Sequence, residues 1–173
     1  MKRAITLLVV SSLLACAGCV PFTSGAGTFR IVAPEPRLVA DADWPAAGYT
    51  LAIQRPVADK TRGTSRIVVR SGPARLAFYP AAAWLDEQPE MLQSLLLQAF
   101  TDSGRWNGVV RPGAARARFS LATEVRRFEV VDAGDGPLVV ELQLHAALLE
   151  VRNGRLVASR AFGHRVPVAG DGV

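Results

Sequence analysis

Half of the 173 residues are hydrophobic and 20% are charged, so the chain can bury a substantial core, and its length is that of a single domain. The formal net charge is +5, and the cations are nearly all arginines scattered among acids, as at Arg111, Arg116, Arg118, Arg126 and Arg127. This scatter argues against a nucleic-acid partner. It indicates a solvated surface that favours an acidic partner or anionic head groups.

The first 15 residues predict an export signal. Lys2 and Arg3 form a positive n-region, an apolar stretch covers residues 4–15, and a cysteine follows small residues. A membrane-spanning helix needs about 20 apolar residues to cross about 30 Å of hydrocarbon. Because the stretch is shorter than that, we expect residues 1–15 to be removed.

The end of this signal, Leu13-Leu14-Ala15-Cys16, resembles the bacterial lipobox, in which the cysteine thiol takes a diacylglycerol and becomes the new N-terminus. Cys16 is preferred because a leucine stands three residues before it. Cys19 is the alternative, since cleavage there leaves no lone thiol in an oxidising compartment. Two or more acyl chains anchor a protein firmly. Ala17 in place of an aspartate indicates the periplasmic face of the outer membrane.

Residues 16–48 predict a tether between this anchor and the folded domain. They are rich in Gly, Pro, Ala and Ser, and a flexible segment of this length spans on the order of 30 Å. One short strand is expected inside it, at residues 29–32.

The domain is predicted over residues 49–166, and it begins with strands. Apolar side chains alternate at Tyr49, Leu51 and Ile53, which is typical of a half-buried strand. Residues 67–70 and 76–79 predict two further strands that form a hairpin around the turn at residues 71–73.

A helix is expected over residues 86–103, because Leu92, Leu95, Leu96, Ala99 and Phe100 fall on one stripe at spacings of three and four. The acidic residues at its start suit the positive end of the helix dipole, and Gly104 ends it. This apolar stripe needs a sheet to cover.

Three long strands follow and can supply that sheet. They are expected at 119–130, with a bulge near Arg127, at 138–148 and at 156–166, and Asn153-Gly154 predicts a two-residue hairpin between the last two. The sequence therefore predicts an α/β fold with a mixed, largely antiparallel sheet and one main helix packed on it.

Several motifs in this domain resemble the auxiliary lipoproteins of ABC-type transport systems. That family has an arginine-led strand, a tyrosine, a tryptophan about five residues later and a Pro-x-Met-Leu-Gln helix start. Here these are Arg66, Tyr79, Trp84 and residues 89–93. The segments DSGRW, RFSLATEVRRFEV and LVASRAFGHRV follow in the same order, so the resemblance covers about residues 49–166.

The resemblance implies a lipoprotein that works beside an MCE-domain substrate-binding protein, a permease and an ATPase, and that helps move phospholipids or other hydrophobic molecules across the cell envelope. It also implies a three-layer-sandwich-like α/β fold. Family members continue into a C-terminal helix, whereas this sequence has a short tail at residues 167–173. Either the chain is truncated or one sheet face lacks its second helix, and that face would then be a surface for homo-oligomerisation or aggregation.

The sequence predicts no enzyme and no cofactor. Its two histidines, His145 and His164, are interpreted as solvated strand residues, and no nucleophile elbow supports a triad that would use Ser120 or Ser159. The carboxylates of Asp86, Glu87 and Glu90 are interpreted as dipole complements rather than a metal site.

No Gly-rich phosphate loop precedes a Lys-Ser or Lys-Thr pair, so an ATP-driven step would belong to a partner. Two other function classes stay open. One is a lipoprotein that assists envelope assembly or activates cell-wall synthesis, and the other is a lipoprotein hydrolase.

Tyr79 and Trp84 are the candidate partner contacts. Large aromatic residues that flank a Pro-Ala loop commonly anchor protein interfaces. The alternative is that both side chains hold this loop onto the helix, and the sequence leaves both interpretations open.

Overall fold

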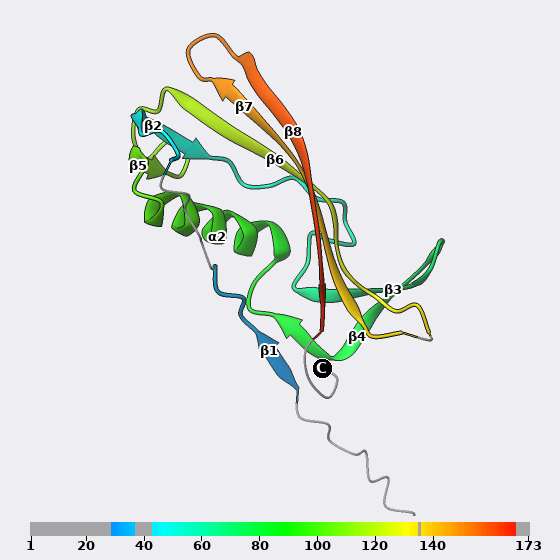
Figure 1. Ribbon diagram of the computed structural model, residues 1–173. Coiled ribbons are helices and arrows are strands. Elements are labelled where there is room, and N and C mark those ends of the chain that lie inside the picture. The colour runs from blue at the N-terminus through cyan, green and yellow to red at the C-terminus, as the bar shows by residue number, and fades with distance from the viewer. Residues whose placement is uncertain (1–28, 37–42, 135, 169–173) are drawn as a thin grey trace, which may run out of the picture.

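One α-helix lies across a curled, mixed sheet of eight strands in the part of the chain that the computed structural model describes, residues 29–36, 43–134 and 136–168 (Figure 1). This confirms the predicted α/β fold with one main helix on the sheet. In chain order the elements are β1 (Arg30–Val32), β2 (Ala47–Ile53), β3 (Arg66–Gly72), β4 (Arg75–Trp84), α2 (Gln88–Asp102), β5 (Trp106–Val110), β6 (Phe119–Val131), β7 (Val139–Glu150) and β8 (Arg155–Pro167).

Strand β6 organises the sheet, because it is long enough to pair with two strands end to end along one edge. Its start pairs in parallel with β2, where Leu51 lies opposite Phe119, and its end pairs in parallel with β3, where Val69 lies opposite Val130. Beyond these, β5 pairs with β2, β4 with β3, and β1 with β4. The other edge of β6 pairs with β7.

Strands β6, β7 and β8 form the predicted antiparallel meander (Figure 1). The predicted bulge is also present, since Val125 pairs with Leu144 and Arg127 with Gln143, which leaves Arg126 as the extra residue. The parallel pairings within the described residues involve only short stretches. The long pairings are therefore antiparallel, as predicted, and the parallel pairings between the described strands are confined to β1 to β6.

The turn between β7 and β8 differs from the prediction, because its loop has four residues, 151–154, rather than two. A type I′ turn needs positive φ at both central residues, and among the described residues only glycines have positive φ. Gly154, with φ of 68°, closes the loop, and its N–H donates to the Glu150 carbonyl at 2.9 Å. The Asn153 side chain instead accepts a hydrogen bond from the N–H of Arg155.

The structure also corrects the expected Pro-Ala loop, because residues 80–83 belong to strand β4. The pairing with β3 shifts there: Val68 lies opposite Phe78, whereas Arg66 lies opposite Ala83. Proline has no N–H to donate, and such an irregularity is where a strand tolerates it. Strand β1 then pairs with residues 82–84 of β4.

Helix α2 begins two residues later than expected and carries Pro89 in its first turn. It ends at Asp102 with Ser103 as its C-cap, and Gly104 follows with φ of 62°. Met91 and Leu92 of its first half are buried against the sheet, in a core that also holds Ile67, Ala82, Trp84, Val125, Phe128 and Val130. The described residues contain no helix with both the length and the apolar character needed to cross a bilayer.

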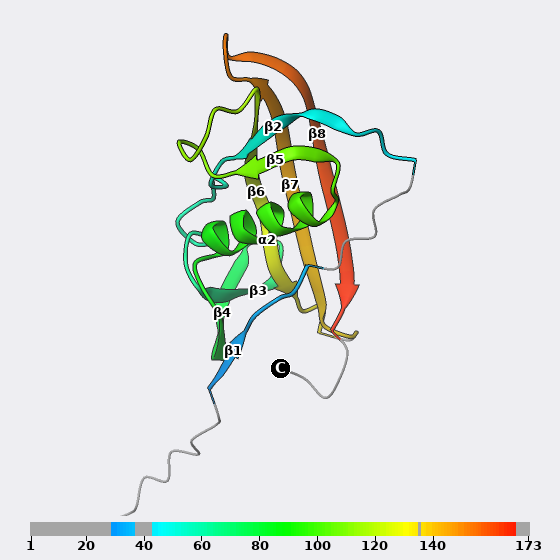
Figure 2. The same ribbon diagram turned by 90° about the vertical axis from the view of Figure 1, so that its left-hand side faces the viewer.

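Strand β8 forms an edge of the sheet, and every residue of it is exposed (Figure 2). Its Phe162 and Val166 lie opposite Leu144 and Val140 of β7, which pack against the core. The apolar face of the sheet therefore continues past the helix onto β8, where Phe162 is 51% exposed.

Candidate functional site

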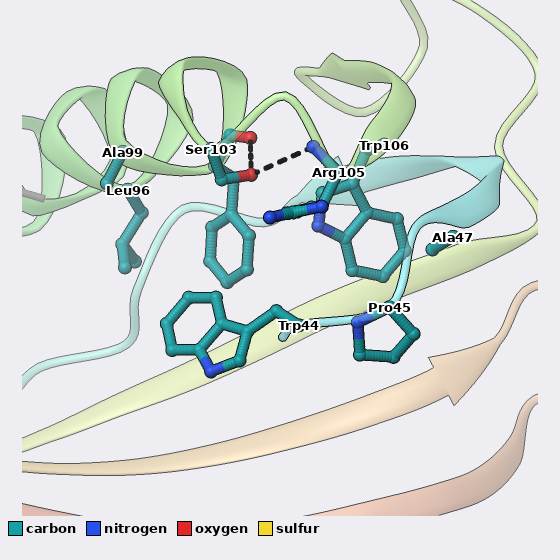
Figure 3. Close-up of a pocket in the computed structure, with 9 residues that line it drawn as sticks. Trp44, Pro45, Ala47, Leu96, Ala99, Ser103, Arg105 and Trp106 are labelled. Atoms are coloured by element: carbon teal, nitrogen blue, oxygen red, sulfur yellow. Dashed lines mark hydrogen bonds between the residues drawn. The ribbon is translucent and has the colours of Figure 1, made fainter. Parts of the chain in front are cut away.

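An apolar pocket of about 410 Å³ lies between the second half of α2 and the neighbouring starts of β2 and β5 (Figure 3). Helix α2 and its C-cap contribute Leu96, Ala99, Phe100 and Ser103, the segment before β2 and its first residue contribute Trp44, Pro45 and Ala47, and the start of β5 contributes Arg105 and Trp106.

The helical wall of this pocket comes from the stripe that the sequence assigned to the core. Leu96, Ala99 and Phe100 share one face because residues three and four apart are neighbours on a helix. Leu92 at the start of the stripe is buried against the sheet, but these three residues are only half-buried. The stripe is thus longer than the part of the sheet that covers it, and its free end becomes the pocket wall.

Main-chain pairing joins the other two walls. The N–H of Ala47 donates to the Arg105 carbonyl at 2.6 Å, and Ala47 lies opposite Trp106 in the parallel pairing of β2 with β5. The rings of Phe100 and Trp106 meet edge to face, with centroids 6.2 Å apart and planes at 75°. These contacts form the pocket within the protein itself, without a ligand or partner.

The chemistry of the lining is almost entirely hydrocarbon. The Ser103 hydroxyl donates to the Phe100 carbonyl at 2.6 Å and accepts from the Arg105 N–H at 3.3 Å, so backbone groups already use it (Figure 3). Arg105 is the charged residue of the lining, and Trp44 is 47% exposed at its outer side. The pocket can therefore accept an apolar group but offers few partners to a polar one.

Sequence reasoning missed this pocket. Trp44 fell within the predicted tether, and Arg105 and Trp106 entered only as part of the DSGRW segment. The available signal was a tryptophan beside a proline in a segment rich in Gly, Pro, Ala and Ser. A tryptophan has a large apolar surface, and its presence there indicates a packing partner.

The two lipidation candidates, Cys16 and Cys19, lie outside the described residues. Part of the predicted tether lies within them. Arg30–Val32 pairs with β4, and Trp44 and Pro45 line the pocket.

Tyr79 and Trp84 both lie on β4, away from the residues that line the pocket. Trp84 is 8% exposed, and its ring stacks on Phe128 with centroids 4.7 Å apart and planes at 21°. Tyr79 is half-buried and packs against the same core cluster. Both side chains therefore have a packing role, and Tyr79 offers more surface to a partner.

A charged cluster lies on the other face of β6, because side chains of a strand alternate between faces. The Glu129 side chain is fully buried between Arg62 and Arg70, and its Oε2 accepts from an Arg62 nitrogen at 2.6 Å. Burial alone would raise the pKa of the Glu129 carboxyl. The hydrogen bonds from Arg70 and Arg62 outweigh that cost and hold this pKa below its ordinary value.

Glu141 of β7 is a second buried carboxylate on this face, 2% exposed. It accepts hydrogen bonds from Arg165 at 3.0 Å, from Arg127 at 3.1 Å and from Gln143 at 2.8 Å. Burial would raise the pKa of Glu141, but the bonds from Arg165 and Arg127 outweigh it, so the pKa is lowered. These partners make both glutamates structural anions.

Of the residues considered for catalysis, Ser120 is engaged in a hydrogen bond, and His145 and Ser159 are diagonal neighbours on β7 and β8, because His145 pairs with Ala161 and Ala147 with Ser159. Ser120 is buried and accepts a hydrogen bond from Gln54 at 2.8 Å, while Ser159 is exposed on β8. His164 is also exposed on β8, and His145 is half-buried on β7.

The carboxylates at the start of α2 are paired with arginines. Glu87 contacts Arg55 at 2.7 Å, and Glu90 contacts Arg55 at 3.3 Å and Arg111 at 2.8 Å. Asp86 accepts a hydrogen bond from the Glu87 N–H. Within the described ranges, no three His, Cys, Asp or Glu side chains are grouped so as to hold a metal ion.

Comparison with solved structures shows the same fold in a protein from Xanthomonas campestris of the DUF330 family, which is 34% identical. The match covers 83% of this chain and 81% of that one, with a TM-score of 0.77. An uncharacterized protein of known structure is 17% identical over 74% of this chain and 79% of its own, with a TM-score of 0.57. Lipoprotein GNA1162 from Neisseria meningitidis is 14% identical over 74% and 88%, with a TM-score of 0.43.

The comparison with curated proteins gave no match. The family model described as the ABC-type transport auxiliary lipoprotein component matches residues 29–173, which include every strand described above and α2. The chain therefore belongs to the ABC-type transport auxiliary lipoprotein family.

Proposed function

We propose that this protein is a non-catalytic, lipid-anchored subunit of an MCE-type ABC transport system that moves phospholipids or other hydrophobic molecules across the cell envelope. Its partners are an MCE-domain substrate-binding protein, a permease and an ATPase. The observation that carries the proposal is the family match over residues 29–173, and the sequence before the match contains a segment that resembles a lipobox.

The proposed work of this subunit is to dock the transport machinery to the periplasmic face of the outer membrane. An anchor at Cys16, or at Cys19, confines the domain to that surface, so a modest protein contact suffices at the raised local concentration. Strand β8 supports such a contact, because an exposed edge strand presents unpaired N–H and C=O groups to a partner strand. A second copy of this chain could pair there too.

Tyr79 and Trp84 remain the proposed aromatic contacts. Their partner role is separable from packing only at Tyr79, because Trp84 stacks on Phe128 in the core. A Tyr79→Ala variant that melts like the unmodified protein but captures less partner supports the contact. Equal capture removes Tyr79 from the interface.

The test is capture of the partner from the native host with the lipidated protein, after cross-linking in intact cells. We expect the MCE-domain protein to be recovered with the lipidated chain and to be lost, together with transport, from a Cys16→Ser, Cys19→Ser double variant. The two single variants identify the acylated cysteine, since only one of them releases the protein from the membrane.

Full partner capture and full transport by the double variant would refute the role of the anchor. Recovery of a cell-wall synthase or an outer-membrane assembly protein, with no MCE-domain protein, would favour the alternative envelope function. Labelling of the purified protein by a serine-reactive probe would favour the hydrolase.

A further inference from the structure

We propose that the apolar pocket between α2 and residues 44–47 binds one acyl chain of a diffusible anionic amphiphile, a fatty acid or a phospholipid. The assignment rests on the proposed transport function for its biological meaning, because it makes this subunit a contact for the cargo and not only a dock. Binding itself follows from the lining and can be measured without any partner.

The first argument is the chemistry of the walls. Leu96, Phe100 and Trp106 present aliphatic and aromatic surface, and the hydroxyl of Ser103 is already bonded to backbone groups. A sugar, nucleotide or peptide backbone would lose its bonds to water here and gain few in return. A hydrocarbon chain has no hydrogen bonds to water to lose. Its binding removes the apolar surface of both the chain and the pocket from water.

The second argument is shape. The volume of about 410 Å³ lies within the range of about 300–1,000 Å³ typical of small-molecule sites. The Phe100–Trp106 contact and the pairing of Ala47 with Trp106 form this cavity within one chain. A concave site that exists before binding suits a flexible acyl chain. The chain loses conformational entropy on binding, but the protein does not have to be ordered as well.

The third argument is charge. Arg105, the charged residue of the lining, is half-buried in the pocket wall, and Figure 3 shows its side chain beside Trp106. A guanidinium carries five N–H donors and pairs well with carboxylate and phosphate oxygens, so its interactions within the protein do not prevent a further contact. Positive charge beside an apolar cavity matches an anionic head group above a hydrocarbon tail.

The experiment follows quenching of tryptophan fluorescence by bromine-labelled laurate at concentrations at which the fatty acid is monomeric. The protein is the mature chain with Cys16→Ser and Cys19→Ser, which carries no acyl group of its own. Trp44 and Trp106 line the pocket, whereas Trp84 is stacked in the core. We expect saturable quenching that decreases in Trp44→Phe and in Trp106→Phe.

Two variants locate the site. Ala99→Leu fills part of the cavity and should weaken binding by about 15- to 60-fold, since it displaces two to three methylene groups of the ligand. Gln98→Leu adds the same side chain at the preceding, exposed position of the helix and should leave the affinity unchanged. Arg105→Gln should weaken binding of laurate severalfold but leave binding of the uncharged dodecanol as it was.

The proposal is overturned if quenching does not saturate, if Ala99→Leu binds as tightly as Gln98→Leu, or if Arg105→Gln weakens laurate and dodecanol alike. Laurate binding by the lipidated protein supports a diffusible ligand. Loss of binding there would assign the pocket to the protein's own anchor and would also overturn the proposal. Partner capture is measured separately, so capture without laurate binding refutes the pocket assignment alone, and laurate binding without capture refutes the docking function alone.

Discussion

Glu129→Gln removes one negative charge from the most deeply buried ion cluster of the described sheet and keeps the volume of the side chain. The Glu129 side chain is 0% exposed, and the side chains of Arg62 and Arg70 are 7% and 20% exposed. Two arginines that were taken out of water would then lack their shared carboxylate. The substitution therefore tests the electrostatics of the cluster without a change in packing.

Removing one partner of a buried ion pair costs about 3–5 kcal/mol, because the remaining charge stays buried and uncompensated. Arg62 also contacts Asp59, and the glutamine amide oxygen can still accept one hydrogen bond, so we expect the lower end, about 3 kcal/mol. For a domain of this size that corresponds to a fall in Tm of about 6–12 °C.

The matched control is Glu150→Gln on β7, the same substitution at an ion pair whose arginine is exposed to water. Glu150 meets Arg155 at 3.4 Å, and Arg155 is 66% exposed. Such pairs contribute about 0–1 kcal/mol.

Urea unfolding followed by circular dichroism at neutral pH compares the two variants, provided that the m-values agree. The electrostatic argument fails if Glu129→Gln loses no more free energy of unfolding than Glu150→Gln.

Three further predictions concern stability. The folded pKa values of Glu129 and Glu141 lie below the unfolded value of about 4.3, so their contribution is complete above about pH 4.3 and is lost as the pH falls through the folded values. The urea midpoint should therefore fall as the pH is lowered below about 4.3, and the fall should be smaller in Glu129→Gln; an equal fall would contradict this. Trp84→Ala should lower the free energy of unfolding in urea by about 3–5 kcal/mol, because Trp84 is stacked in the core. Trp44→Ala, at a residue 47% exposed, should lower it much less. Similar losses in the two variants would place Trp84 outside the core. Gly104→Ala should lower the free energy of unfolding by about 1–2 kcal/mol, because the φ of Gly104 is 62°. Gly48→Ala should lower it by less, because Gly48 has open space around it and no positive φ, and thermal melts of the two variants test this difference.

The elements that could be predicted from sequence are those in which a local period decides burial. The stripe of Leu92, Leu95 and Phe100 predicts α2 because 3.6 residues complete a turn, and the alternation in residues 138–148 predicts β7 because side chains of a strand alternate. The bulge beside Arg127 was visible for the same reason, since the alternation changes parity there. Each of these signals depends only on neighbours within the same element.

The rest depended on which segments meet. Nothing local shows that β2 and β3 lie end to end along β6, or that Pro80 belongs to a strand, because both follow from the pairing register. Glu129 is one residue from Phe128 and, like any alternating polar residue, is expected to face water. Only the placement of Arg62 and Arg70 around it makes it a buried anion.

By itself, the sequence determined the helix, the antiparallel meander and the family resemblance, because each of these depends on patterns in consecutive residues. Tertiary structure alone decided the pocket. Its walls come from residues 44–47, from the second half of α2 and from the start of β5, and main-chain pairing between β2 and β5 brings them together. A cavity is the space that packed elements leave unfilled, so its existence depends on how the chain is arranged in three dimensions.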